Sequence, residues 1–312
     1  MGTYCFGIDV GGTTVKCGLF RTDGTLVEKW EIPTRKENNG DQILPDVAAA
    51  VNVKMEEKGI SKEEVEGVGI GVPGPVNSKG EVSRAVNLFW GYKNVVGEME
   101  ELTGLHAEAG NDANVAALGE AWKGAAAGSS DVIMVTLGTG VGGGIIINGK
   151  ILTGENGAGG EIGHMCVNLE ETDTCGCGGH GCLEQYASAT GISRLARKKM
   201  EHETRATILT KEDLSAKAVF DAVKEGDEVA IEVATEMGNY LGHAMADMAA
   251  VLDPAVFVIG GGVSKAGEVL LSFIEKPFME KAFFANKNVK FKLATLGNDA
   301  GICGAAKLVL ED

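Results

Sequence analysis

The chain has 312 residues, 44% of them hydrophobic, and carries 44 Asp and Glu against 28 Lys and Arg. A chain of this length and composition can bury a sizeable core, and we expect two domains. The net charge of -16 excludes nucleic acid and anionic membrane as main partners, because the field of the protein repels both. The sequence has neither a membrane-length apolar run nor a signal-peptide pattern, so we expect a cytoplasmic protein.

Both halves of the chain open with a glycine-rich hairpin. The predicted strand–turn–strand units are 4–8, 9–14 and 15–20, and again 132–137, 138–144 and 145–147. Two similar hairpins indicate a duplicated architecture. The remaining expected elements are helices at 46–58, 94–103, 113–127, 188–203, 216–224 and 227–252 and strands at 65–72 and 256–259. Strands that alternate with helices predict an α/β fold.

The tip of the first hairpin, Asp9 to Thr14, has the chemistry of a phosphate clamp. Gly11 and Gly12 let backbone N–H groups approach an anion, and the hydroxyl of Thr13 adds a donor. Asp9 can hold Mg²⁺ through water. The alternative is a tight turn that needs glycine for a positive φ.

Two nucleotide-binding patterns fail on their context. Residues 138–143 approach a dinucleotide-binding fingerprint, but a strand follows them where that motif needs a helix. Residues 144–150 approach a P-loop, but Ile151 stands where Ser or Thr is required. We therefore exclude both the Rossmann motif and the P-loop.

Three of the seven cysteines, Cys175, Cys177 and Cys182, lie in one glycine-rich loop. With His164 they form the right donor set for a closed, structural Zn²⁺ site. His180 is the competing imidazole, and a disulfide is the alternative use of the thiols. The remaining cysteines lie in apolar stretches and are expected to be buried. They are Cys5, Cys17, Cys166 and Cys303.

Asn111 and Asp112 stand at the start of the apolar helix 113–127. The local pattern favours Asp112 as a helix cap. Its alternative role is a general base that takes a proton from an attacking hydroxyl. Glu161 and Glu184 flank the cysteine loop and can accept hydrogen bonds from substrate hydroxyls, although exposed glutamates are usually only solvated.

Several motifs, in this order, resemble the ROK family of sugar kinases, and its glucokinase branch in particular. They are 9–13 (DVGGT), 71–75 (GVPGP), 111–114 (NDAN), 137–144 (LGTGVGGG), 161–164 (EIGH), 175–177 (CGC) and 182–184 (CLE). The resemblance implies the actin-like ATPase (ribonuclease H-like) fold, two α/β lobes with the active site in the cleft. We expect a smaller lobe at 1–117, completed by a C-terminal helix at 301–312, and a larger lobe at 118–300.

The resemblance also implies roles for individual residues. Asp112 is the expected catalytic base, and the expected sugar contacts are Asn111, Asp112, Glu161, His164 and Glu184. The implied zinc ligands are His164, Cys175, Cys177 and Cys182. The implied nucleotide-binding residues are Asp9, Gly11, Gly12, Thr13, Gly138, Thr139, Gly260, Gly261 and Gly262.

The implied reaction is the ATP-dependent phosphorylation of glucose to glucose 6-phosphate, with Mg²⁺ accompanying ATP. N-acetylmannosamine, fructose, allose or mannose are alternative sugars, and polyphosphate is an alternative donor. A sugar-responsive repressor is the non-enzyme alternative, but the hairpin begins by Tyr4 and leaves no room for an N-terminal DNA-binding domain. A sugar sensor without catalysis is disfavoured by Asp112. We also expect a homo-oligomer, a dimer or a tetramer.

Overall fold

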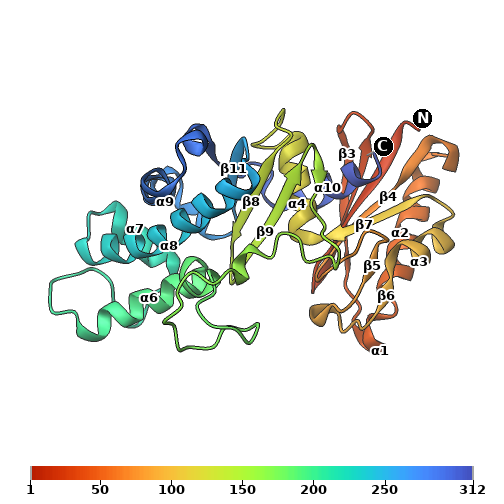
Figure 1. The fold of residues 1–312 in the computed structure, drawn as a ribbon. Coiled ribbons are helices and arrows are strands. Elements are labelled where there is room, and N and C mark those ends of the chain that lie inside the picture. The colour runs from red at the N-terminus through yellow and green to blue at the C-terminus, as the bar shows by residue number, and fades with distance from the viewer. Residues whose placement is uncertain (1, 311–312) are drawn as a thin grey trace. The chain divides into compact units, whose positions relative to one another are not determined.

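The computed structural model describes residues 2–310, which fall into two compact units (Figure 1). The first unit comprises residues up to 130, residues 144–160 and the chain from 295 onward; the second comprises 131–143 and 161–294. The lobe limits expected from the sequence, 1–117 with 301–312 and 118–300, stay a prediction. Residues 311–312 of the expected C-terminal helix lie outside the described residues.

The first unit is built on a five-stranded sheet of order β3-β2-β1-β4-β7. Its strands are β1 (Tyr4–Val10), β2 (Thr14–Arg21), β3 (Leu26–Pro33), β4 (Val65–Val72) and β7 (Ala107–Asn111). The β1-β2-β3 segment is antiparallel, whereas β4 and β7 continue the sheet in parallel with β1. A small two-stranded sheet pairs β5 (Glu81–Val82) with β6 (Lys93–Asn94).

Helices cover both faces of this sheet, because alternate residues of each strand point to opposite sides. Phe6 and Ile8 lie in one core with buried residues of α2 (Ile43–Lys58) and α3 (Val95–Thr103). Cys5 lies on the other face, in a core with α10 (Ala300–Leu308). The remaining helices of this unit are α1 (Glu37–Gly40) and α4 (Asp112–Lys123).

Glycines let α10 approach the sheet closely. A Cβ on Gly7 would overlap the carbonyl oxygen of Ile302, and one on Gly69 would overlap that of Ala305. A Cβ on Gly304 would likewise overlap the carbonyl oxygen of Val115 in α4. The chain therefore packs α10 backbone to backbone against β1, β4 and α4.

The second sheet has the order β10-β9-β8-β11-β12, which repeats the connectivity of the first. Its strands are β8 (Val132–Leu137), β9 (Val141–Ile147), β10 (Lys150–Ile151), β11 (Val256–Gly260) and β12 (Lys290–Leu293), and the limit between the two units falls within β9. The helices of the second unit are α5 (Glu184–Ala187), α6 (Ala189–His202), α7 (Ala216–Lys224), α8 (Glu228–Leu252) and α9 (Glu268–Lys281). The predicted duplication is confirmed.

Short 3₁₀ helices complete the fold. They are η1 (Lys62–Glu64), η2 (Val86–Leu88), η3 (Ile162–His164), η4 (Val263–Ala266), η5 (Phe284–Asn288) and η6 (Gly297–Asp299).

Three expectations about the limits of elements and the burial of cysteines are wrong. The helix expected to reach 127 ends at Lys123, because Gly124 has φ −106° and ψ −147° and leaves the helical region. The second glycine turn is shorter than 138–144, since strand β9 already begins at Val141. Cys166 is exposed rather than buried, whereas Cys5, Cys17 and Cys303 are buried.

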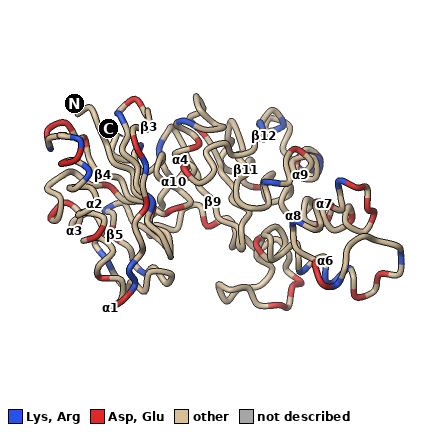
Figure 2. The backbone as a smooth tube through the Cα atoms, turned by 180° about the vertical axis from the view of Figure 1, so that it is seen from behind, with Lys and Arg blue, Asp and Glu red and all other residues tan. Residues whose placement is uncertain are grey.

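Within residues 2–310, no helix combines the length and apolar character that a membrane-spanning segment needs. Along the backbone of both units, Asp and Glu residues are interspersed with Lys and Arg residues (Figure 2).

Candidate functional site

In the first unit, Asn111 rather than Asp112 caps helix α4. The side-chain oxygen of Asn111 accepts hydrogen bonds from the N–H groups of Ala113 and Asn114 at 3.0 and 3.2 Å, and its Nδ2 donates to the carbonyl of Gly74 at 3.1 Å. Asp112 is the first residue of the helix and is exposed, with Oδ1 accepting from the N–H of Ala113 at 2.8 Å. Asn111 therefore provides the N-cap, and the Asp112 carboxylate lies in the first turn of the helix, at the positive end of the helix dipole.

Asp9, near the end of β1, has two close neighbours, Lys16 and Gly301. Its Oδ2 is 3.7 Å from Nζ of Lys16, its cross-strand partner on β2. A Cβ on Gly301, in the first turn of α10, would come within 2.7 Å of the Asp9 carboxyl group. Burial raises the pKa of Asp9, and the Lys16 ammonium opposes that rise. The sequence reasoning missed Lys16, although hairpin register pairs it directly with Asp9.

The turn between β1 and β2 does not need glycine for its backbone conformation. Neither Gly11 nor Gly12 has a positive φ, so the simple-turn explanation is wrong. Gly11 is needed because a Cβ would lie 2.7 Å from the carbonyl oxygen of Thr14. A Cβ on Gly12 would meet nothing nearer than 3.9 Å. That contact, with Asn87, is an ordinary van der Waals distance, so neither the backbone φ nor close packing requires glycine at position 12.

Two glycine turns of the second unit follow the same pattern. Gly261 has φ +83° and no room for a Cβ, since one would lie 2.5 Å from the carbonyl oxygen of Leu137. By contrast, a Cβ on Gly262 would meet nothing within 4 Å, and one on Gly138 nothing nearer than 3.9 Å. Neither Gly138 nor Gly262 has a positive φ. The fold therefore requires glycine at neither position 138 nor position 262, and the backbone at Gly262 faces open space.

A pocket of about 340 Å³ adjoins the turn at Gly262. Phe220 of α7 and Val263 and Ala266 of η4 line it, together with Lys265. A partly apolar pocket of this size accommodates a flat ring system. No motif in the sequence indicated Phe220, because it lies in an amphipathic helix where apolar residues are expected as core.

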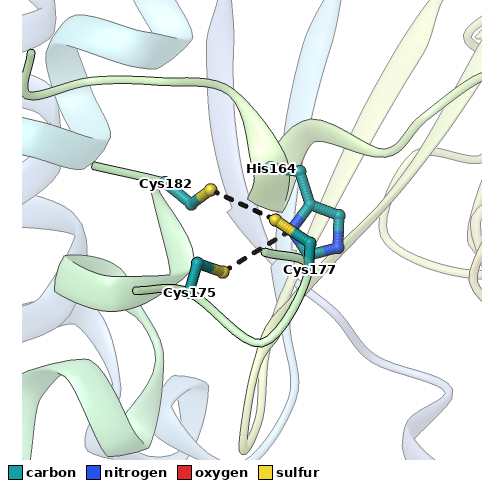
Figure 3. Close-up of side chains that lie close together, drawn as sticks. All are labelled: His164, Cys175, Cys177 and Cys182. Atoms are coloured by element: carbon teal, nitrogen blue, oxygen red, sulfur yellow. Dashed lines mark hydrogen bonds between the residues drawn. The ribbon is translucent and has the colours of Figure 1, made fainter. Parts of the chain in front are cut away.

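His164, Cys175, Cys177 and Cys182 gather in the second unit, with their ligand atoms all within 4.8 Å of one another (Figure 3). The Sγ atoms of Cys177 and Cys182 are 3.6 Å apart, and Sγ of Cys175 is 4.0 Å from Nδ1 of His164. In a tetrahedral site with Zn–S bonds of about 2.3 Å, neighbouring sulfurs lie about 3.8 Å apart. The donor set therefore fits a zinc ion, and the four ligand atoms are close enough to converge on one after small shifts of the side chains.

The structure distinguishes between the two imidazoles. His180 lies outside the cluster and places Nδ1 3.2 Å from the carbonyl of Asp173. The two ring nitrogens of His164 face different groups: Nδ1 faces Cys175, and Nε2 lies 3.9 Å from Oε2 of Glu161. The cysteines are all free, so the disulfide alternative is not seen.

Glu184 lies beside the metal-ligand cluster and beside the second glycine turn. Its Oε1 accepts a hydrogen bond from the Cys175 thiol at 3.1 Å and is 3.9 Å from Nδ1 of His164. A Cβ on Gly140 would lie 2.5 Å from its Oε2. Burial raises the pKa of Cys175 to about 12, whereas the N–H of Gly179 lowers the pKa of Cys177. A metal that binds here must therefore displace the Cys175 proton.

Comparison with known proteins covers nearly the whole chain. The ROK family model matches residues 5–312. A glucokinase of Halalkalibacterium halodurans is 44% identical, covering 98% of this chain and 94% of that protein. A glucokinase of Thermotoga maritima is 35% identical, covering 98% of this chain and 96% of its own length.

A solved structure is similar over the same extent. The ROK family glucokinase of Streptomyces griseus, in complex with glucose and AMPPNP, is 35% identical with a TM-score of 0.74, covering 98% of both chains. The predicted α/β fold of the actin-like, ribonuclease H-like type is thereby confirmed.

Proposed function

The chain belongs to the ROK family, and from that premise we propose that it phosphorylates glucose at the expense of ATP, giving glucose 6-phosphate and ADP. The observation that carries the proposal is full-length similarity to glucokinases at 44% and 35% identity. The similar Streptomyces structure holds glucose together with an ATP analogue, which supports the same pair of substrates here.

Asp112 is the proposed general base. Its carboxylate accepts the proton of the sugar hydroxyl as the hydroxyl oxygen bonds to the γ-phosphorus, while the bond from that phosphorus to the β–γ bridging oxygen breaks and ADP leaves. The exposed position of Asp112 at the start of α4 supports this role, since Asn111 already caps the helix.

The glycine turns are the proposed phosphate-binding elements. Gly11, Gly12 and Thr13 in the first unit and Gly138 and Thr139 in the second supply N–H and hydroxyl donors to the phosphates. Support comes from Gly12 and Gly138 themselves, because neither a positive φ nor a close contact requires glycine at these two positions. Asp9 is proposed to hold, through water, the Mg²⁺ ion that binds together with ATP.

The turn at Gly260, Gly261 and Gly262 is proposed to bind the nucleoside. The pocket that Gly262 shares with Phe220 and Val263 offers an apolar surface of suitable size for the base.

Glucose hydroxyls are proposed to contact Asn111, Glu161, His164 and Glu184, besides Asp112. His164, Cys175, Cys177 and Cys182 would hold a zinc ion, which supplies rigidity to the loop and leaves Nε2 of His164 for the sugar. Glu161 and Glu184 near the two ring nitrogens of His164 support a polar, acceptor-rich surface for hydroxyls. A cytoplasmic location and a homo-oligomeric state stay predictions.

A coupled ADP-release assay tests the proposal. The protein is offered glucose, N-acetylmannosamine, fructose, allose and mannose, each with ATP. Parallel reactions with polyphosphate are followed by sugar phosphate formation, because that donor releases no ADP. We expect the highest kcat/KM for glucose with ATP. A higher kcat/KM for another sugar would reassign the substrate, and the absence of ADP release with every sugar would overturn the kinase assignment.

A further inference from the structure

The second unit contains a partly buried polar cluster next to the cysteine loop, to which neither the metal site nor the proposed reaction assigns a role. Its members are Glu171 and Asp173, which precede the first cysteine, Tyr186 of α5, which follows the last, and Arg194 of α6. We call these four residues the Arg194 clamp. All of them belong to the second unit.

Arg194 joins the entering and leaving ends of the cysteine loop. Its Nη2 donates to Glu171 and, at 2.6 Å, to Oδ2 of Asp173, while Nε donates to the same oxygen at 3.2 Å. Its Nη1 donates to the carbonyl of Gln185 at 3.3 Å, on the far side of the cysteines. Gln185 closes the ring, because its Nε2 donates to the carbonyl of Asp173 at 2.9 Å.

Three of the four clamp side chains are largely shielded from water, whereas Asp173 is 58% exposed. The Glu171 side chain is only 7% exposed. It accepts hydrogen bonds from the Tyr186 hydroxyl at 2.6 Å and from the N–H of Asp173 at 3.0 Å. The Tyr186 ring stacks on Tyr240 of α8 at 3.9 Å and lies under the Arg194 guanidinium. Buried, satisfied polar networks of this kind fix one conformation.

Helix α6 connects this clamp to the second glycine turn. The N–H of Ala189, its first residue, donates to the carbonyl of Gly138 at 2.8 Å. Ser188, the N-cap, donates its hydroxyl to the carbonyl of Glu184 at 2.6 Å. One helix therefore contacts the turn at Gly138, the residue Glu184 and, through Arg194, both ends of the cysteine loop.

We propose that Arg194 is a positioning residue. It fixes the cysteine loop and Glu184 relative to the turn at Gly138, whether or not a metal is bound. The inference rests on the proposed function in that Glu184 and His164 are taken as sugar contacts. Arg194 lines the same pocket as Thr139, Gly140 and Glu184, and the role proposed for Arg194 is to position the loop rather than to react. A lysine cannot replace it, because one ammonium cannot reach both carboxylates and a carbonyl in the fork geometry of a guanidinium.

The alternative is that Arg194 only stabilises the fold. The two roles give different results, because loss of stability alone lowers the amount of folded protein without changing the KM or the metal affinity of the fraction that remains. The test therefore measures substrate KM and metal affinity on folded protein.

The variants are Arg194→Met and Arg194→Lys, with Lys198→Met as matched control. Lys198 lies one turn further along α6, contacts the same Asp173 carboxylate at 3.5 Å, and is half exposed. Zn²⁺ affinity is measured by competition with a chromophoric chelator, and KM for glucose and for ATP by the coupled assay.

We expect both Arg194 variants to weaken Zn²⁺ affinity and raise the KM for glucose by about 10- to 100-fold, the usual effect of removing groups that orient metal ligands. We expect kcat to stay within about threefold, because the loss falls on ground-state binding. Lys198→Met should behave as wild type. Unchanged Zn²⁺ affinity and glucose KM in folded Arg194→Lys would overturn the proposal, as would equal effects of Lys198→Met.

Should Arg194→Met fail to fold, Arg194→Lys and Glu171→Gln give the same readouts with smaller perturbations. Failure of the proposed function is recognised separately. In that case the wild type releases no ADP with any sugar, whereas the Arg194 variants still differ from it in Zn²⁺ affinity.

Discussion

The Gly301→Ala substitution tests the role of Asp9 without touching the residue itself. Gly301 lies in the first turn of α10, and a Cβ there would come 2.7 Å from Cγ and Oδ2 of Asp9. An ordinary contact needs at least 3.4 Å, so the carboxylate must move by about 0.7 Å. The β1 backbone cannot follow, because Asp9 is paired with Lys16 on one side and Gly71 on the other.

A displacement of this size changes the geometry of the Mg²⁺–nucleotide site. Misplacement of an aligned group by about 1 Å costs on the order of 10²-fold in rate, so we expect kcat/KM for MgATP to fall by about 10- to 100-fold. Alanine is favoured over glycine in a helix by about 1 kcal/mol, which offsets part of the steric strain. A large loss of stability is therefore not expected.

The assay is steady-state ADP release at saturating glucose, with thermal unfolding measured on the same sample. Gly91→Ala serves as control, because a Cβ at Gly91 would meet nothing within 4 Å and Gly91 has no positive φ. Wild-type kcat/KM for MgATP in folded Gly301→Ala would refute the reasoning that the position of Asp9 matters.

Two further predictions concern the cysteine loop. Cys177→Ser should both lower the zinc content and raise the KM for glucose, the KM by about 10- to 100-fold. Elemental analysis measures the zinc content and the coupled assay measures the KM. A zinc-free variant with normal kinetics would contradict the link between zinc binding and sugar affinity. The second prediction concerns acid stability. Although burial opposes it, hydrogen bonds from Tyr186, Asp173 and Arg194 lower the pKa of Glu171 to about 2 from 4.5. Glu171 therefore stabilises the folded state above pH 4.5, and this stabilisation is lost as the pH falls toward 2, by at most about 3 kcal/mol. In urea titrations between pH 6 and pH 3, Glu171→Gln should lose less stability than the wild type, and equal losses would contradict the assignment.

Local signals in the sequence were sufficient to predict those features that depend on a single rule of chain geometry. The hairpin at Asp9–Thr14, the repeat of that hairpin near 138, and the cysteine loop were all recognisable from glycine and cysteine spacing. The choice between Cys3His with His164 and with His180 was not decided by spacing, because both imidazoles lie within reach along the chain. The fold places only His164 in the cluster.

Tertiary context accounts for what was missed. The end of α4 at Lys123 depends on Glu120, whose buried carboxylate accepts hydrogen bonds from the N–H groups of Ala125, Thr295 and Leu296. In the sequence, Arg194 is one of several basic residues on α6. Its partners become apparent only in the fold, which brings residues 171–173 next to that helix. Cys166 lies in an apolar stretch yet is exposed, and periodicity alone could not assign its face.

The central claim is that the Asp112 carboxylate removes the proton from the attacking hydroxyl. The most direct measurement compares Asp112→Asn with the wild type in glucose binding, by calorimetry, and in kcat, by ADP release. We predict glucose affinity within about tenfold of the wild type and a kcat lower by at least about 10²-fold. An Asp112→Asn enzyme that turns over at nearly the wild-type rate would contradict the mechanism.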